Sequence, residues 1–490
     1  MASRRDFLTH IGGGFGALAL AALEQPSLVE QPAAAEQAAA QQQPAAAQRP
    51  EVARQTASAP WITRPARVQR VIQLFMNGGA SQMDLFDYKP ALAKHHGEKI
   101  DFGVKAAATS VPGTIMKSPF EFRQHGESGR WVSSVLPNIA KCVDDLAFLM
   151  AMASKSNVHG PASYMQNTGF ILPGFPSVGS WISYALGRIT DNLPTFVVLP
   201  DPRGLPYNNM GNFSNAFLPA THAATVIKPT APVPIADLFP PTTAKFITPQ
   251  SATDGLELLQ SLNRDHARQR RGDSRLDARI ESYELAARLQ LSAPEVLDIA
   301  RETEATHRMY GLHEAHSADF GRQCLVARRM IERGVRFVQV WSGAGGASKN
   351  WDNHSDIPQE LPFISRQIDQ PTAGLLQDLK ARGLLEDTLV IWTTEFGRMP
   401  FTQGSVGRDH NGGTFVTWLA GAGIKAGSTH GESDEYSYQT AINTTYCYDL
   451  HATVLHLLGI DHERLTFRHN GLDRRLTDVH GHVIHEILSS

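Results

Sequence analysis

Five short apolar runs constrain the fold more than any other feature of this sequence. They are rich in branched and aromatic side chains and end in Gly, Pro or polar residues, which is typical of strands in a parallel sheet covered on both faces. They comprise residues 68–76, 196–199, 335–341, 389–393 and 415–419.

Helical patterns separate these runs. The patterns at 372–382 and 451–458 are each followed by a glycine suited to a helix C-cap, and a third, 311–334, leads into the run at 335. Repeated helix–glycine–strand units predict an α/β sandwich with helices on both faces of a central, mostly parallel sheet.

Two stretches fit this alternation less well. Residues 205–253 are rich in Pro, Ala and Thr and predict a long surface loop. Residues 261–308 are charged and helical in pattern and predict a solvated helical hairpin. We expect one large domain over 61–490 with a helical insertion at about 255–315, and a lateral insertion without chemistry is its simplest interpretation.

The N-terminus has the order of an export signal. Arg4 and Arg5 precede Phe7 and Leu8, and a weakly apolar, Gly- and Ala-rich run follows at 11–23. We therefore expect a twin-arginine signal over 1–24 and a periplasmic or extracellular location; the alternative is an ordinary N-terminal helix. Residues 25–60 are mostly Ala, Gln and Pro and predict a disordered linker.

Composition excludes several classes of protein. With 45 Lys and Arg against 48 Asp and Glu, the chain lacks the cationic excess of a nucleic-acid binder. No apolar stretch reaches the length of a transmembrane helix, so no stable span is expected after signal removal. The three cysteines are widely spaced and odd in number, which argues against a disulfide framework and a cysteine zinc site.

Acidic and imidazole side chains cluster where the predicted strands end. Ligands of open parallel sheets bind at the carboxyl ends of the strands. Read singly, each such residue is also explained as a turn former, helix cap or hydrogen-bonded loop residue. Together they predict a divalent metal site for Zn, Mn, Ca or Mg. The candidate ligands are Asp84, Asp87, Asp352, His354, Glu395 and His410.

Two further patterns are given less weight. His480, His482 and His485 lie in a segment, 478–488, whose pattern predicts a turn and a terminal strand, so we interpret them as surface histidines. The chain has no Gly-x-Ser-x-Gly elbow on a strand–helix turn, and a serine esterase has no support.

In combination, several motifs resemble an exported family called domain of unknown function 1501. The resemblance covers about 67–488 and rests on Asn77-Gly78-Gly79, Trp351-Asp352-Asn353-His354, Glu395-Phe396-Gly397-Arg398, Gly407-Arg408-Asp409-His410 and Asp449-Leu450-His451-Ala452-Thr453. That family is similar to sulfatases and the alkaline phosphatase superfamily. The resemblance implies a three-layer sandwich and a metal centre at the C-terminal edge of its sheet.

Position by position, the resemblance also implies roles. Asp84 or Asp87 resembles the first-strand metal aspartate, and Asp352 with His354 resembles the second acidic and imidazole pair. Residues 394–397 occupy the place of the sulfatase Ser-Asp-His-Gly segment, but Glu395 replaces Asp and Phe396 replaces a metal-binding His.

The nucleophile signature departs further from the sulfatases. His159 stands at the nucleophile's position and Ser163 at that of the arginine, so the usual sulfatase mechanism is not expected. An imidazole can attack phosphorus or act as an acid or base. Hydroxyl nucleophiles at Ser154, Ser156 or Ser163, or direct attack by metal-activated water, stay open as alternatives.

These observations predict an exported metal-dependent hydrolase of phosphate or sulfate esters, including sulfated or phosphorylated glycans. His159 would transfer a proton or attack, and Arg398 with Arg408 would stabilise the anionic transition state. The alternative is a noncatalytic periplasmic binding or scaffold protein with the same fold.

Overall fold

The computed structural model describes residues 59–103, 112–235, 248–270, 274–346 and 350–489. The expected export signal and nearly all of the expected linker fall in residues 1–58, outside the described residues.

A nine-stranded sheet forms the centre of the described part of the chain, in the order β12-β4-β11-β8-β1-β7-β5-β6, with β15 beside β4. Every pairing is parallel except those of β11, which runs antiparallel to β4 and β8. The strands are β1 Arg70–Met76, β4 Leu146–Ala153, β5 Phe196–Leu199, β6 Thr225–Val226, β7 Phe337–Ser342, β8 Thr388–Thr394, β11 Phe415–Gly421, β12 Thr429–His430 and β15 Thr445–Tyr446. The predicted mostly parallel sheet is confirmed.

All five predicted runs form strands of this sheet, although the run at 415–419 becomes the one reversed strand, β11. The eight-residue strand β4, which lies near one edge of the sheet, was not predicted. Its sequence, LAFLMAMA, is buried throughout, but Leu, Ala and Met favour helices, so local propensity gave no strand signal. Tertiary pairing with β11 decides the outcome here.

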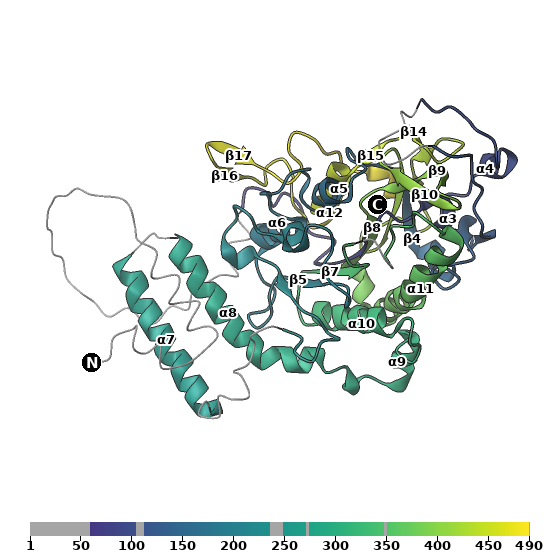
Figure 1. Ribbon diagram of the computed structural model, residues 1–490. Coiled ribbons are helices and arrows are strands. Elements are labelled where there is room, and N and C mark those ends of the chain that lie inside the picture. The colour runs from purple at the N-terminus through teal and green to yellow at the C-terminus, as the bar shows by residue number, and fades with distance from the viewer. Residues whose placement is uncertain (1–58, 104–111, 236–247, 271–273, 347–349, 490) are drawn as a thin grey trace.

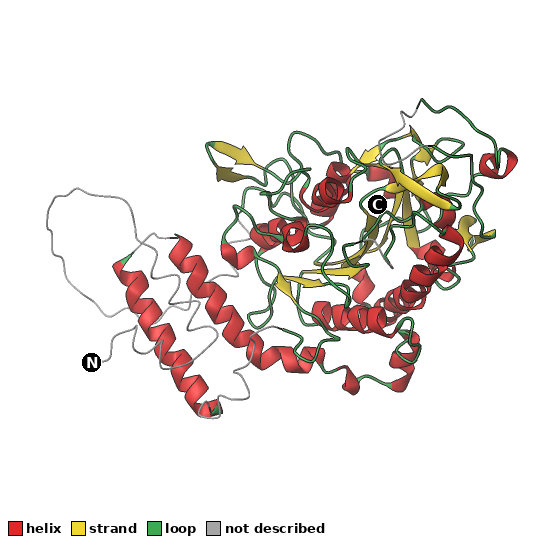
Figure 2. Ribbon diagram, in the orientation of Figure 1, coloured by secondary structure: helices red, strands yellow, loops and turns green. Residues whose placement is uncertain are grey.

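Helices cover both faces of the sheet. On one face α10 (Ala318–Glu332) and α11 (Ile357–Ala381) share a core with Ile72 and Val338. On the other, α6 (Val178–Leu186) and α12 (Cys447–Leu457) share a second core with Phe75 and Trp341. Figure 1 shows these layers around β5 and β7, and Figure 2 shows the helices on both sides of the strands. The three-layer sandwich is therefore confirmed.

The helix predicted at 372–382 extends much further toward the N-terminus than expected, because α11 begins at Ile357. Pro362 and Pro371 lie inside it. Since an interior proline removes a helical hydrogen bond, sequence patterns place a boundary there. The packing of Leu361, Ile364 and Ile368 into the core outweighs that cost.

Two long helices occupy the charged region, α7 (Pro249–Gln269) and α8 (Ser274–Leu297). Figure 1 shows α7 beside α8 and projecting away from the sheet, while the C-terminal end of α8 packs into the core through Leu289, Ala293 and Val296. Within the described ranges no helix has both the length and the apolar character needed to cross a bilayer.

Shorter elements complete the chain. The remaining helices and two-stranded pairs are α3 Gln82–Leu85, α4 Pro90–Lys94, α5 His159–Thr168, α9 Glu304–Met309, β2 Phe122–His125 with β3 Arg130–Ser133, β9 Gly397–Gln403 with β10 Gly407–Asn411, β13 Glu432–Ser433 with β14 Thr440–Ile442, and β16 Phe467–His469 with β17 Leu472–Arg474.

The expected terminal strand at 478–488 is wrong. This segment contains a short 3-10 helix, η7 (His485–Ile487), and a single bridge between Leu488 and Ile424. Helix α12 binds it instead, because Asp449 accepts a hydrogen bond from the His482 amide at 2.8 Å and Thr453 accepts one from the Ile484 amide at 3.0 Å. The Asp449–Thr453 motif therefore anchors the C-terminal segment.

The same helix carries a buried neutral histidine that links stability to pH. His451 Nε2 contacts the carbonyl of Gln166 on α5 at 3.1 Å, and its Nδ1 has no partner. Burial lowers the pKa of His451 to about 4. In an unfolded chain the same imidazole takes up a proton near pH 6.5. The contribution of neutral His451 to the free energy of unfolding is therefore complete above that pH and is lost as the pH falls toward the pKa of the folded state.

We expect His451→Gln to reduce this acid sensitivity. Between about pH 7.5 and about pH 5.5, the free energy of unfolding should fall by about 1.4 kcal/mol less in the variant than in the wild type. Urea titrations at both pH values measure the difference. His482→Gln, at an exposed position, is the control; equal pH dependence of wild type and His451→Gln would contradict the prediction.

Candidate metal centre

Four side chains from three separate parts of the chain converge at the carboxyl edge of the sheet. His159 is the first residue of α5, Asp352 and His354 lie in the loop after β7, and His410 is on β10. One ligand atom from each of the four lies within 4.8 Å of the others. Of the predicted ligands, Asp352, His354 and His410 are thus brought together.

Asp352 Oδ1 is the centre of this cluster. It lies 2.7 Å from His354 Nε2, 3.0 Å from His410 Nε2 and 3.2 Å from His159 Nε2. The Nε2 atoms of His354 and His410 are 2.8 Å apart. Four ligands about 2.1 Å from a tetrahedral ion would lie about 3.4 Å apart, so a small expansion accommodates an ion.

The outer nitrogen of each imidazole is already committed. The Nδ1 atoms contact Glu395 Oε1 at 2.7 Å, Gln403 Oε1, and the Asn157 carbonyl at 2.9 Å. These oxygens accept hydrogen bonds, so each neutral ring carries its proton on Nδ1 and presents an Nε2 lone pair. Three lone pairs and a carboxylate oxygen facing one point are the donor set of a metal cation.

An orphaned atom supports the same conclusion. His159 is 8% exposed, and its Nε2, although close to Asp352, is directed so that it forms no hydrogen bond. A buried polar atom without a partner costs about 1–3 kcal/mol. A ligand-to-metal bond at Nε2 would remove this cost, so the residues present fit a divalent ion.

Electrostatics favour an ionised Asp352 carboxylate. Burial raises the pKa of Asp352, but the contacts with the three imidazoles, together with the Arg398 charge, outweigh it and hold the pKa well below its usual range. Burial lowers the pKa of His410 to about 4. For His159, burial is outweighed by Asp352 and Glu395, and its pKa is raised.

Glu395 lies one layer behind the cluster. Its fully buried carboxylate accepts hydrogen bonds from the Gly78 amide at 2.8 Å and the Thr394 hydroxyl at 3.1 Å, besides that from His159. We expected Glu395 to be a ligand, but the structure instead places it where it orients a ligand, as in carboxylate–histidine–metal arrangements.

Asp84 and Asp87 are not part of the cluster, although the sequence predicted both as ligands. Asp84 forms a fully buried ion pair with Arg408, with Nε at 2.7 Å and Nη2 at 3.1 Å. Asp87 accepts hydrogen bonds from the hydroxyls of Ser433 and Ser437 and pairs with Lys89 at 3.3 Å. Both carboxylates are occupied by protein groups.

Arg398 and Arg408, which we expected to bind an anion, are both engaged with protein groups. Both side chains are fully buried. Arg398 donates to Asp352 Oδ1 at 2.7 Å and to four backbone carbonyls, those of Gly78, Gly79, Trp351 and Arg408. It fixes the carboxylate and the loops around it, and Arg408 neutralises Asp84.

The turn after β1 must be glycine for the centre to form. Gly78 has φ 126°, and a Cβ there would lie 2.6 Å from the Asp352 amide; at Gly79, φ is 77° and a Cβ would lie 2.5 Å from Phe396. Phe396 packs against the rings of His159 and His410, with centroid distances of 4.9 and 4.7 Å. The residue that departs from the sulfatase pattern therefore forms an apolar wall.

Sequence reasoning missed His159 as a ligand and Tyr207 as a neighbour. His159 was assigned to proton transfer or attack, because β4 went unrecognised and α5 had no strand before it. Tyr207 lies in the stretch predicted as surface loop, and no motif marks it. The Tyr207 ring stacks on the His159 ring, with the ring centroids 4.2 Å apart and an interplanar angle of 5°.

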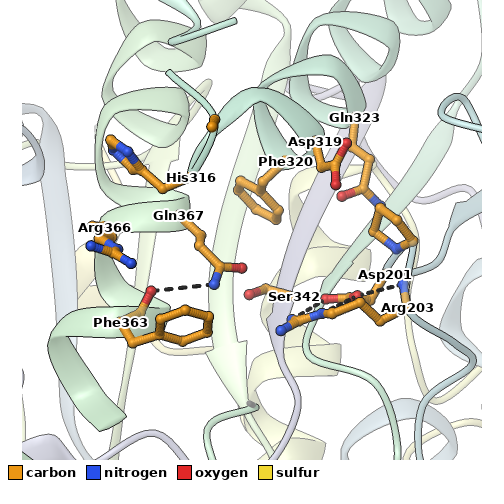
Figure 3. A pocket seen from close by; sticks show the side chains of 12 residues that line it. Asp201, Arg203, His316, Asp319, Phe320, Gln323, Ser342, Phe363, Arg366 and Gln367 are labelled. Carbon is orange, nitrogen blue, oxygen red and sulfur yellow. Dashed lines mark hydrogen bonds and ion pairs between the residues drawn. The ribbon is translucent and has the colours of Figure 1, made fainter. Parts of the chain in front are cut away.

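A separate cavity of about 540 Å³ lies at the ends of β5 and β7, between the starts of α10 and α11 (Figure 3). Its wall includes the Asp201–Arg203 ion pair, at 2.6 Å, and Ser342, the last residue of β7. None of the four clustered residues lines it.

Fold and site together define a class: an α/β sandwich with a histidine-rich candidate metal centre at the carboxyl edge of a mostly parallel sheet. Residues 68–488 match the family described as "Protein of unknown function (DUF1501)", and the chain belongs to that family. No curated protein matches the sequence.

Several solved structures match the chain at low sequence identity and low TM-score. The lipoteichoic acid synthase LtaP from Listeria monocytogenes is 10% identical, with 80% of this chain and 73% of that chain covered and a TM-score of 0.34. The PsFucS1 sulfatase from Pseudoalteromonas sp. is 13% identical, with 81% of this chain and 69% of that chain covered and a TM-score of 0.32. The phosphonate monoester hydrolase of Agrobacterium radiobacter is 13% identical, with 80% of this chain and 74% of that chain covered and a TM-score of 0.32.

Proposed function

We propose that this protein is an exported, metal-dependent hydrolase of phosphate or sulfate esters. One observation carries the proposal: three imidazole Nε2 atoms and Asp352 Oδ1 face one point, while each Nδ1 is bound to an outer acceptor. With the ring protons on Nδ1, the four inward-facing atoms are all acceptors without a proton between them, and such a group of atoms binds a cation.

The donor set favours a borderline ion such as Zn or Mn. Imidazole suits these ions, whereas Ca and Mg prefer oxygen ligands. Held by His159, Asp352, His354 and His410, such an ion would supply Lewis-acid chemistry toward an ester oxygen and would make water a stronger nucleophile.

The surrounding charges suit an anionic ester. With neutral imidazoles, the carboxylates of Asp352 and Glu395 and the guanidinium of Arg398 leave one net negative charge. A divalent ion reverses that sign, so the loaded centre attracts an anion and the empty one repels it. Glu395 holds the proton on His159 Nδ1, which keeps Nε2 directed inward.

A noncatalytic binding or scaffold function is the second candidate. It is favoured by the burial of Arg398 and Arg408, which leaves neither guanidinium to contact a transition state, and by His159 occupying the nucleophile's position as a ligand. Ser163 is likewise fully buried and cannot meet a substrate without rearrangement.

The deciding experiment measures metal content and turnover on the same full-chain protein. Wild type and His354→Gln are loaded with Zn or Mn, and hydrolysis of p-nitrophenyl phosphate, bis-p-nitrophenyl phosphate and p-nitrophenyl sulfate is followed. We expect bound metal and turnover in the wild type, and a loss of turnover of about 100-fold or more in the variant. His482→Gln is the matched control.

Bound metal without turnover on any ester would favour the binding function, and no bound metal would overturn both. Export is tested separately by replacing Arg4 and Arg5 with Lys. Arrest of the precursor inside the cell supports the twin-arginine route, and unimpeded passage to the periplasm removes it.

A further inference from the structure

Tyr207 lies beside the candidate metal centre, and neighbouring residues hold both its backbone and its side chain in place. Its carbonyl accepts a hydrogen bond from the Asn212 side chain. On the opposite side, Gly345 donates to the Leu205 carbonyl at 2.7 Å, and a Cβ at Gly345 would lie 2.8 Å from the Tyr207 amide. The loop therefore holds Tyr207 in one place beside the residues that follow β7.

The hydroxyl of Tyr207 has two neighbours that fix its direction. Asn350 Nδ2 donates to it at 3.3 Å, and Asp352 Oδ2 lies 3.4 Å away. Because an ionised carboxylate can only accept, the hydroxyl donates its proton to Asp352 Oδ2. The Asn350 amide donates more closely to the carbonyls of Ala344 and Gly346, at 3.0 and 2.8 Å, and so stays fixed beside the hydroxyl. Asn350 Oδ1 also accepts a hydrogen bond from the Asp352 backbone amide at 2.9 Å, so the three residues are linked to one another.

The two oxygens of Asp352 consequently have different surroundings. Oδ1 faces the three imidazoles and accepts from Arg398. Oδ2 faces Tyr207. Oδ1 has a second lone pair besides the one that accepts from Arg398, and it lies among the imidazole Nε2 atoms, whereas the Tyr207 hydroxyl holds Oδ2 on the other side. One carboxylate oxygen alone would then join the three Nε2 atoms in a four-ligand set.

We propose that Tyr207 is a positioning residue of the metal centre, whose hydroxyl holds Asp352 Oδ2 away from the ion and makes this carboxylate a one-oxygen ligand. The inference rests on the proposed metal centre and names a determinant of its affinity and geometry. The competing explanation is packing alone, because the Tyr207 ring covers His159 at 4.2 Å.

Tyr207→Phe separates these explanations, because it keeps the stacked ring and removes only the hydroxyl. In the full chain, we expect Zn affinity measured by equilibrium dialysis to fall about 10- to 100-fold, the range for residues that orient metal ligands. With Co as the probe, the visible absorption should weaken as Asp352 Oδ2 joins the ion and the coordination number rises.

Tyr184→Phe is the matched control. Tyr184 is also half-buried, and its hydroxyl donates to the Thr466 carbonyl at the same 3.4 Å, but it lies against Trp61 and Trp181 instead of the centre. Its replacement should leave Zn affinity and the Co spectrum unchanged. Circular dichroism confirms that both variants are folded.

Wild-type affinity and an unchanged Co spectrum in Tyr207→Phe would overturn the inference while leaving the proposed metal centre intact. Failure of the wild type to bind Zn or Co would instead overturn the metal centre and this inference with it. Weaker binding with a changed spectrum supports the positioning role.

Discussion

Asp352→Asn should abolish stoichiometric metal binding. Asp352 Oδ1 is the atom that all three imidazoles face, and the amide that replaces it supplies neither the negative charge nor the same ligand strength. We expect affinity for Zn to fall by more than about 100-fold, beyond the effect of changing an orienting residue. Metal analysis after gel filtration measures the change.

This substitution also removes the counter-charge of the buried Arg398 guanidinium, so some stability is lost, but Arg398 keeps its hydrogen bonds to four backbone carbonyls, and circular dichroism checks that the variant is folded. Asp473→Asn is the control, since that carboxylate is 59% exposed and pairs with Arg468 on a surface hairpin. A folded Asp352→Asn protein that still retains one tightly bound ion per chain would show that the ion sits elsewhere.

Asp84→Asn should have the opposite combination of effects, with a large loss of stability and unchanged metal content. Asp84 and Arg408 are both fully buried and joined by two contacts, so the substitution leaves a guanidinium without its counter-charge. Breaking a buried pair in this way costs about 3–5 kcal/mol of unfolding free energy. Urea unfolding measures the loss.

Two comparisons sharpen this second experiment. Glu121→Gln breaks an ion pair with Arg123 in which both side chains are 77% exposed, and should cost less than about 1 kcal/mol. Replacing the pair together, Asp84→Leu with Arg408→Met, should recover most of the stability, because neither charge is left unpaired. Loss of bound metal in a folded Asp84→Asn protein would restore Asp84 as a ligand.

The strands predicted correctly share a local signal. The runs of β1, β5, β7 and β8 are short, apolar and rich in branched or aromatic residues, and they are buried on both faces, so the sequence pattern alone identifies them. The composition of β4 suits a helix, and α11 contains prolines that usually end one. In both cases packing against distant segments overrides local preference.

The site was predictable in position but not in detail. Asp352, His354 and His410 were grouped as candidate ligands because they follow or precede strands whose ends meet at one edge, and the structure brings these three side chains together. Whether a side chain faces the cluster or lies behind it depends on partners that are far away in the sequence. Asp84 could not be told from a ligand without knowing that Arg408 faces it, and Glu395 could not be placed behind His159 until α5 was located.

The spacing of the four ligands along the chain has a consequence for when an ion can be captured. His159 precedes β5, whereas His410 belongs to a hairpin close to the last strands of the sheet. In the proposed centre, a partly folded intermediate that lacks either end of this span has an incomplete ligand set, so capture of an ion would coincide with completion of the sandwich. A translocation machinery that accepts only finished molecules would carry the ion across together with its protein, and the metal supply of the cell interior would then determine which ion arrives outside.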